Sequence, residues 1–165
     1  MRESCVNSHD YLDMGLYLSV DGEIRVMMKD HMNKILSDFP EKIQGRVVTP
    51  ASEHPFTVRD DADRKLLYKE KSIEFHHAVT QLFFDTTRFR KNIHTSVTFI
   101  TKRARIPGKD DWQKLLQVLQ HIISTIHMPL LLSVDKLSIV KRWVDASYAM
   151  HPDCWSHIGA TVSLV

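Results

Sequence analysis

The sequence predicts an α+β fold on the strength of three observations. Apolar residues alternate strictly from Leu12 to Met28, which is the pattern of a β-hairpin with one buried face. Between about residues 72 and 124 they recur at helical spacing, which predicts three helices packed as a small bundle. After Pro129 short apolar runs of strand length return. Strands and helices thus occupy separate parts of the chain, as in the α+β class.

The N-terminal hairpin is expected to turn at Asp21-Gly22, because Asp-Gly supplies the positive backbone angles of a two-residue turn. Apolar residues at helical spacing then predict a short helix over about 29–38, which ends before Pro40. From residue 39 to 71, prolines and the mixed-charge string "RDDADRK" indicate a surface connection.

The last helix of the expected bundle follows the Pro-Gly break at 107–108, with Asp110 or Asp111 as its N-cap. Beyond it, "LLLSV" at 130–134, a turn at Asp135-Lys136 and "SIVKRWVDASYA" at 138–149 are expected to be strands. A further strand, "IGATVSLV", reaches Val165, where we expect its domain to be truncated.

The composition is that of an ordinary globular chain, with 165 residues, 43% hydrophobic and 25% charged. A net charge of +2 does not by itself require a nucleic-acid partner. Cys5 and Cys154 form no zinc-finger spacing, and no apolar run is long enough for a membrane span. We therefore expect an intracellular protein, cytoplasmic or nuclear, without a membrane partner.

The order of these elements and three strings resemble the copia-type retrotransposon polyprotein at the junction of its reverse transcriptase and ribonuclease H. "HDYLDMGLYLSVDGEIRVMMKDHMNKIL" at 9–36 resembles the late palm hairpin and helix. "FHHAVTQLFFDTTRFRKNIHTSVTFITKRARIPGKDDWQKLLQVLQHI" at 75–122 resembles the helical thumb and connection, and "VDASYAMHPDCWSHIGATVSLV" at 144–165 resembles the opening hairpin of ribonuclease H. The resemblance implies a palm end at 9–38, a connection at 39–71, a three-helix thumb or connection segment at 72–127 and a truncated ribonuclease H-like start at 128–165.

The chain departs from the family pattern in ways that fit a decaying element copy. The departures are Asp13 for glycine, Lys91-Asn92 for Pro-Asp within Arg-Pro-Asp-Ile, Ile123-Ser124-Thr125 for Arg or Lys with Gly-Thr, and Ile158 with Ala160 for Thr-Gly-Gly or Thr-Ser-Gly.

The resemblance implies that Asp145, in "DAS", is the first metal-binding carboxylate of ribonuclease H, which holds two Mg²⁺ ions. The alternative is an ordinary charge near the end of a strand. The remaining ligands would lie beyond Val165, so we expect no stable Mg²⁺ site in this chain. The Asp pairs at 60–61 and 110–111 are better explained as a solvated turn and a helix cap than as a polymerase metal site. His151, Cys154 and His157 have ligand spacing but no fourth zinc ligand.

Two segments are candidates for nucleic-acid contact. By resemblance, Met14 and Gly15 would hold the end of a primer, although an ordinary hairpin explains the same pattern. Residues 86–105 contain no Asp or Glu, and such a run can neutralise phosphates or form a solvated helix face. Its six cations are Arg88, Arg90, Lys91, Lys102, Arg103 and Arg105.

The sequence therefore leads us to expect a catalytically incomplete fragment of an RNA-directed DNA polymerase and ribonuclease H. Its residual function would be weak binding to an RNA–DNA hybrid or primer-template, with the rest of a retroelement polyprotein as a possible partner. One alternative is a non-catalytic protein-interaction module that uses helices 72–124. Another is a self-sufficient nuclease that uses Asp145.

Overall fold

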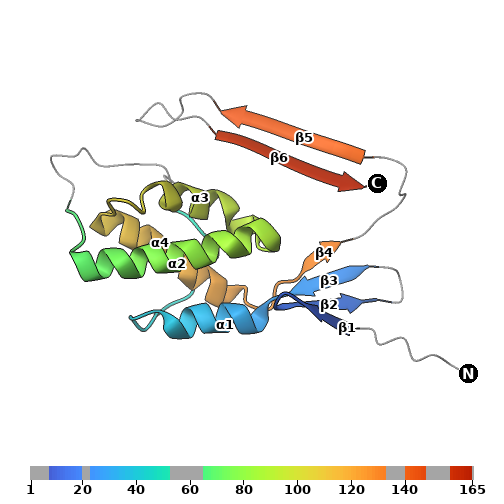
Figure 1. Cartoon of the computed structure of the whole chain (residues 1–165), viewed down its shortest axis with the longest axis horizontal. Helices are drawn as coiled ribbons and strands as arrows, with labels where there is room; N and C mark the ends of the chain where they lie inside the picture. The colour runs from blue at the N-terminus through green and yellow to red at the C-terminus, as the bar shows by residue number, and fades with distance from the viewer. Residues whose placement is uncertain (1–7, 20–22, 53–64, 133–139, 148–156, 165) are drawn as a thin grey trace, which may run out of the picture.

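The structure, a computed structural model, describes residues 8–19, 23–52, 65–132, 140–147 and 157–164 (Figure 1). Its strands are β1 (Ser8–Tyr11), β2 (Met14–Leu18), β3 (Ile24–Met27), β4 (Leu130–Leu132), β5 (Val140–Ser147) and β6 (His157–Leu164). Its helices are α1 (Lys29–Asp38), α2 (Lys69–Arg88), the short 3₁₀ helix η1 (Lys91–Ile93), α3 (His94–Lys102) and α4 (Lys109–Ser124). This mixture of helices with antiparallel sheet is compatible with the expected α+β class.

The expected hairpin is formed by β2 and β3, but its register differs from the prediction by one residue. Leu18 lies opposite Ile24, and the backbone N–H of Ser19 donates to the carbonyl of Glu23 at 2.9 Å. Five residues, 19–23, therefore join the strands, and 20–22 lie outside the described residues. A two-residue turn at 21–22 would have placed the apolar residues of the two strands on opposite faces, because residues directly opposite each other share a face.

A second hairpin, which the sequence analysis missed, joins β1 to β2 through Leu12 and Asp13. Tyr11 lies opposite Met14, and the two turn residues have φ angles of 50° and 62°. These positive angles match the tight turn that favours Asn-Gly. Glycine would adopt these backbone angles without strain, whereas Leu12 and Asp13 do so less readily.

The helical prediction is confirmed, and α1 joins the three-helix bundle in one apolar core. Trp112 lies in this core, with its ring centroid 5.3 Å from that of Phe39 and 6.5 Å from that of Phe75. Burial of Phe39 means that the connection after α1 begins inside the core and not on the surface. The side chains with 0% exposure are Phe75, Leu82, Ile93, Leu115, Leu119, Ile122 and Val97, together with polar Asp85 and Thr86.

Helix α4 begins differently from the prediction. Gly108, and neither Asp110 nor Asp111, occupies the N-cap position. Asp111 instead lies three residues inside the helix, where its Oδ2 accepts the backbone N–H of Gly108 at 2.8 Å. This contact satisfies a buried donor just ahead of the helix and places a negative charge near the positive end of the helix dipole.

Strand β4, which falls within the expected segment 128–165, pairs with the N-terminal sheet. Leu130 lies opposite Val26, so β4 extends the N-terminal sheet in the order β1-β2-β3-β4 and does not open the C-terminal unit. The turn expected at 135–136 lies outside the described residues. Strands β5 and β6 form a separate antiparallel sheet in which Val140 lies opposite Leu164 (Figure 1). None of the helices in the described ranges combines the length and hydropathy of a membrane span.

Candidate nucleic-acid interface

The basic residues of the acid-free run gather at the two ends of α3. Arg88 ends α2 and Lys91 begins η1, ahead of α3. Lys102 ends α3, and Arg103 and Arg105 follow it. Helix and turn formation thus divides one sequence run into two clusters, separated by the nine residues of α3.

Arg90 does not belong to this surface, because its side chain is buried with 2% exposure. Its Nη1 donates to the backbone carbonyl of Thr125 at 2.8 Å, and its Nη2 donates to Oγ1 of the same residue at 2.5 Å. Burial lowers the pKa of Arg90, and nearby Asp85 opposes this effect. The expectation that Arg90 contacts a phosphate backbone is therefore wrong in this structure, where it ties the start of η1 to the end of α4.

The other cations lie closer to solvent. The Arg88 guanidinium carbon lies 4.0 Å from the centroid of the Phe84 ring, and Nζ of Lys91 donates to the carbonyl of Thr87 at 2.6 Å. Lys102 and Arg105 are exposed. The side chain of Arg103 is 17% exposed and its Nε lies 3.7 Å from Oδ1 of Asp111, so part of its charge is balanced within the protein. Arg88, Lys91, Lys102 and Arg105 are the cations best placed to meet a polyanion.

Asp85 is a buried carboxylate beneath the Arg88 end of this surface. Its side chain is 0% exposed, and its Oδ1 lies 3.1 Å from Nε2 of His31 on α1. The two atoms are close but not aligned as a hydrogen bond, and neither oxygen of Asp85 has a hydrogen-bond partner among the described residues. Burial raises the pKa of Asp85 to about 7, although Arg90 and then Arg88 act in the opposite direction.

A second polar contact links η1 to α4. Nδ2 of Asn92 lies 3.0 Å from Nε2 of His121. Burial, and next the charge of Arg90, lower the pKa of His121, while backbone contacts at Val48 and Val47 raise it. A lowered pKa favours a neutral imidazole that accepts the amide hydrogen of Asn92.

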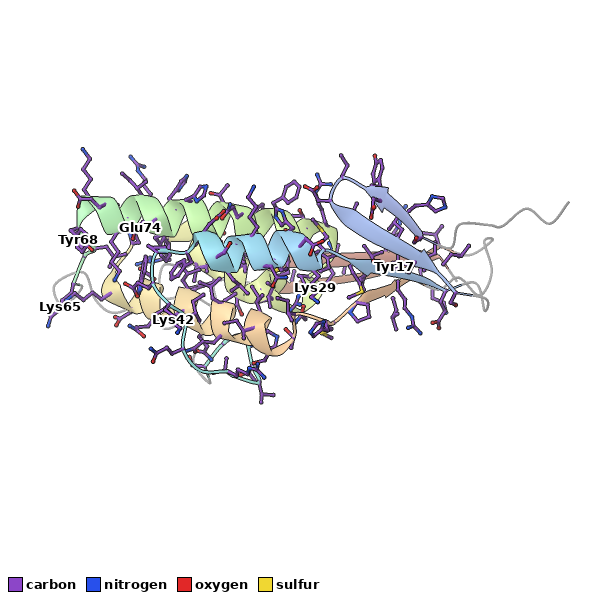
Figure 2. All side chains as sticks on the ribbon, turned by 90° about the horizontal axis from the view of Figure 1, so that it is seen from below. Tyr17, Lys29, Lys42, Lys65, Tyr68 and Glu74 are labelled. Atoms are coloured by element: carbon purple, nitrogen blue, oxygen red, sulfur yellow. The ribbon has the colours of Figure 1, made fainter. Side chains whose placement is uncertain are left out.

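Met14 and Gly15 are adjacent in β2 but lie on opposite faces of the sheet. Met14 packs against the core. Gly15 lines a hollow of about 650 Å³ together with Tyr17 and the start of α1, where Lys29 lies (Figure 2). A Cβ at Gly15 would lie 3.0 Å from the Tyr17 ring, so this ring occupies the space over the glycine.

The charge of this hollow is mixed. It is lined by Lys29, Lys34 and His31, but also by three carboxylates, Asp10, Asp13 and Asp30. Because the carboxylates outnumber the lysines, the hollow offers a phosphate backbone less attraction than the ends of α3. Of the two residues predicted to contact the primer, only Gly15 lines this hollow, where a nucleic-acid strand could approach it.

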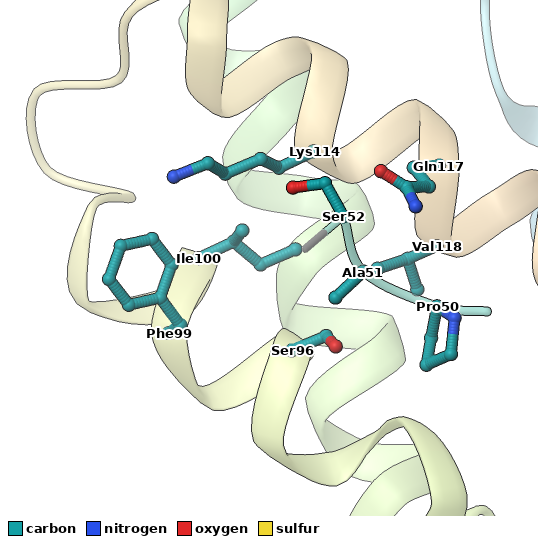
Figure 3. A pocket seen from close by; sticks show the side chains of 9 residues that line it. All are labelled: Pro50, Ala51, Ser52, Ser96, Phe99, Ile100, Lys114, Gln117 and Val118. Carbon is teal, nitrogen blue, oxygen red and sulfur yellow. The ribbon is translucent and has the colours of Figure 1, made fainter. Parts of the chain in front are cut away.

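A smaller recess lies where residues 50–52 cross α3 and α4 (Figure 3). It is lined by Ala51, Ile100 and Val118 among others, and its interior volume is about 10 Å³, close to the space that one water needs. Lys114 lies at its edge with its Nζ 4.5 Å from the Phe99 ring centroid, and burial lowers its pKa. The recess is too small to hold a nucleotide.

Asp145 lies in β5 opposite Gly159 of β6, near the end of the strand as expected. Its side chain lies outside the described part of the structure. Among the described residues no three His, Cys, Asp or Glu side chains come together as metal ligands.

Sequence reasoning missed buried Asp85 with its neighbour His31, and also missed buried His121. Burial of Asp85 could have been predicted from helical spacing, since Asp85 falls in phase with Phe75, Val79 and Leu82 on the buried stripe of α2. An acid on such a stripe is uncommon and indicates a polar partner in the core. The partners themselves come from other helices and are not visible in any local pattern.

The chain matched no protein-family model, no curated protein and no solved structure.

Proposed function

We propose that this chain is a fragment of a copia-type retroelement polyprotein, from the end of the reverse transcriptase to the start of ribonuclease H, and that it binds nucleic acid through the phosphate backbone. In this proposal β2, β3 and α1 correspond to the palm edge, α2 to α4 to the thumb or connection, and β5 with β6 to the opening ribonuclease H hairpin. In this proposal the chain's own contribution is nucleic-acid binding.

The observation that carries binding is the charge around α3. Arg88, Lys91, Lys102 and Arg105 lie at its two ends, and residues 86–105 contain no acidic side chain. Each phosphate that these cations neutralise releases counterions, which favours association without regard to base sequence.

Two local features support the proposed origin. The family strings Arg-Pro-Asp-Ile and Gly-Thr are each only partly present in this chain. Arg90 of the first string and Thr125 of the second are retained, and these two residues hydrogen-bond to each other. The turn at Leu12 and Asp13 has the positive φ angles for which the family glycine is suited.

The test is fluorescence anisotropy with a labelled RNA–DNA hybrid at low salt. Arg88→Gln with Lys91→Gln removes one cluster, whereas Lys42→Gln removes an exposed lysine outside the acid-free run (Figure 2). We expect the double variant to bind several-fold more weakly and the Lys42 variant to bind like the wild type. Equal binding by all three proteins would contradict the assignment.

A protein-interaction module remains a second candidate, because Ile73, Phe83 and Phe84 on α2 are exposed by 62%, 38% and 39%. Binding of a protein partner through these apolar groups would be nearly insensitive to salt, whereas backbone binding weakens steeply with salt.

A further inference from the structure

The C-terminal half of α2 exposes two aromatic rings side by side in the sequence. Phe83 is 38% exposed and Phe84 is 39% exposed, although phenylalanine is usually buried. The Phe84 ring lies beside α1, with its centroid 5.9 Å from that of the His31 ring, and the Phe83 ring lies beside His94 at the start of α3. Thr80 and Thr87, one turn away on either side, are also exposed.

Each ring has a flat cationic or imidazole group against it. The Arg88 guanidinium lies over the Phe84 ring, with 4.0 Å between the guanidinium carbon and the ring centroid. The Phe83 and His94 rings are stacked, with centroids 6.3 Å apart and planes inclined by 30°. Guanidinium and aromatic planes of this kind are the groups on which unpaired bases stack.

The charge around the rings favours a polyanion. From Phe75 to Lys109 the sequence contains seven Lys or Arg residues and a single acid, Asp85, which is 0% exposed. An apolar protein partner seated on the rings would have to desolvate Arg88 and the nearby Lys91, whereas a nucleic-acid strand supplies both bases and phosphates.

We propose that Phe83, Phe84, Arg88 and His94 form a stacking surface for unpaired bases of single-stranded nucleic acid, with Lys91 contacting the backbone. The inference rests on the proposed function, because the same cations attract the nucleic-acid strand to the protein. It requires in addition that the strand have unpaired bases. A duplex presents base edges in its grooves and keeps base faces stacked inside, so it cannot use this surface fully.

The test compares three labelled ligands by fluorescence anisotropy: a thymidine strand of about twelve nucleotides, an abasic strand of the same length, and a blunt duplex. Since one stacked base contributes at least about a five-fold gain in affinity, we expect the thymidine strand to bind at least that much more tightly than the abasic strand. Phe83→Leu with Phe84→Leu keeps apolar side chains but removes the ring faces, and should abolish this preference without changing the salt dependence.

Tyr68→Leu is the matched control, because Tyr68 is an exposed aromatic residue at the opposite end of α2 (Figure 2). It should leave the preference for bases intact, and circular dichroism should show that all variants remain folded. Equal affinity for thymidine and abasic strands, tighter binding of the duplex, or an unchanged preference in the double variant would overturn the inference while leaving backbone binding in place.

Absence of binding to all three ligands would overturn both the proposed function and this inference. Concentration-dependent dimerisation that disappears in the Phe83 and Phe84 double variant, without any preference for bases, would assign the surface to a second copy of the chain and also overturn the inference.

Discussion

Replacing Asp85 by asparagine should change how the stability of the fold depends on pH. The carboxyl is 0% exposed, and its pKa rises from 3.8 to about 7 because burial outweighs the charges of Arg90 and Arg88. The folded state therefore holds this proton more tightly than the unfolded chain does. The resulting stabilisation is complete below about pH 3.8 and is lost as the pH rises to about 7. A shift of roughly three units corresponds to about 4 kcal/mol.

The assay is urea denaturation of the wild type and of Asp85→Asn at several pH values from about 4 to about 8. Asparagine keeps the shape of the side chain but does not titrate. The free energy of unfolding of the wild type minus that of the variant should therefore fall by about 4 kcal/mol across this range. Asp38→Asn, at an exposed position of α1, controls for the loss of a carboxylate. A difference that stays constant with pH would refute the reasoning.

Three further predictions follow from local geometry. Leu12→Asn with Asp13→Gly should raise the free energy of unfolding by about 1 kcal/mol in thermal or urea denaturation, because both positions have positive φ; an unchanged midpoint would argue against this turn. Asn92→Asp should raise the pKa of His121 in an NMR titration, since a carboxylate would face Nε2; an unchanged pKa would show that the two groups are not in contact. Asp145→Asn should leave binding to an RNA–DNA hybrid unchanged with or without Mg²⁺, and Mg²⁺-dependent cleavage lost in this variant would reveal a complete nuclease site.

Periodicity was enough to predict the helices and the β2–β3 hairpin, because burial of one face imposes spacing that is visible in the chain. The details it missed depend on partners distant in sequence. Leu130 pairs with Val26 across about a hundred residues, and no local feature of "LLLSV" selects that partner over β5. The turn at Leu12 and Asp13 was hidden because Leu12 continues the apolar alternation of the strand and no glycine marks the turn.

The candidate site was predicted less well for a related reason. Net charge along the sequence identified the run from 86 to 105, but it could not separate Arg90, which is buried against Thr125, from exposed Lys91 one residue later. Burial depends on which side of η1 faces α4. Exposed Phe83 was likewise hidden, since a sequence pattern treats phenylalanine at helical spacing as core.

The most direct test of nucleic-acid binding is the slope of log affinity against log salt for an RNA–DNA hybrid. If Arg88, Lys91, Lys102 and Arg105 each neutralise one phosphate, the slope should be about −3.6 by the duplex relation, and it should be about halved in the Arg88→Gln with Lys91→Gln variant. A slope near zero, or one that the double substitution leaves unchanged, would contradict the proposal that these cations bind the backbone.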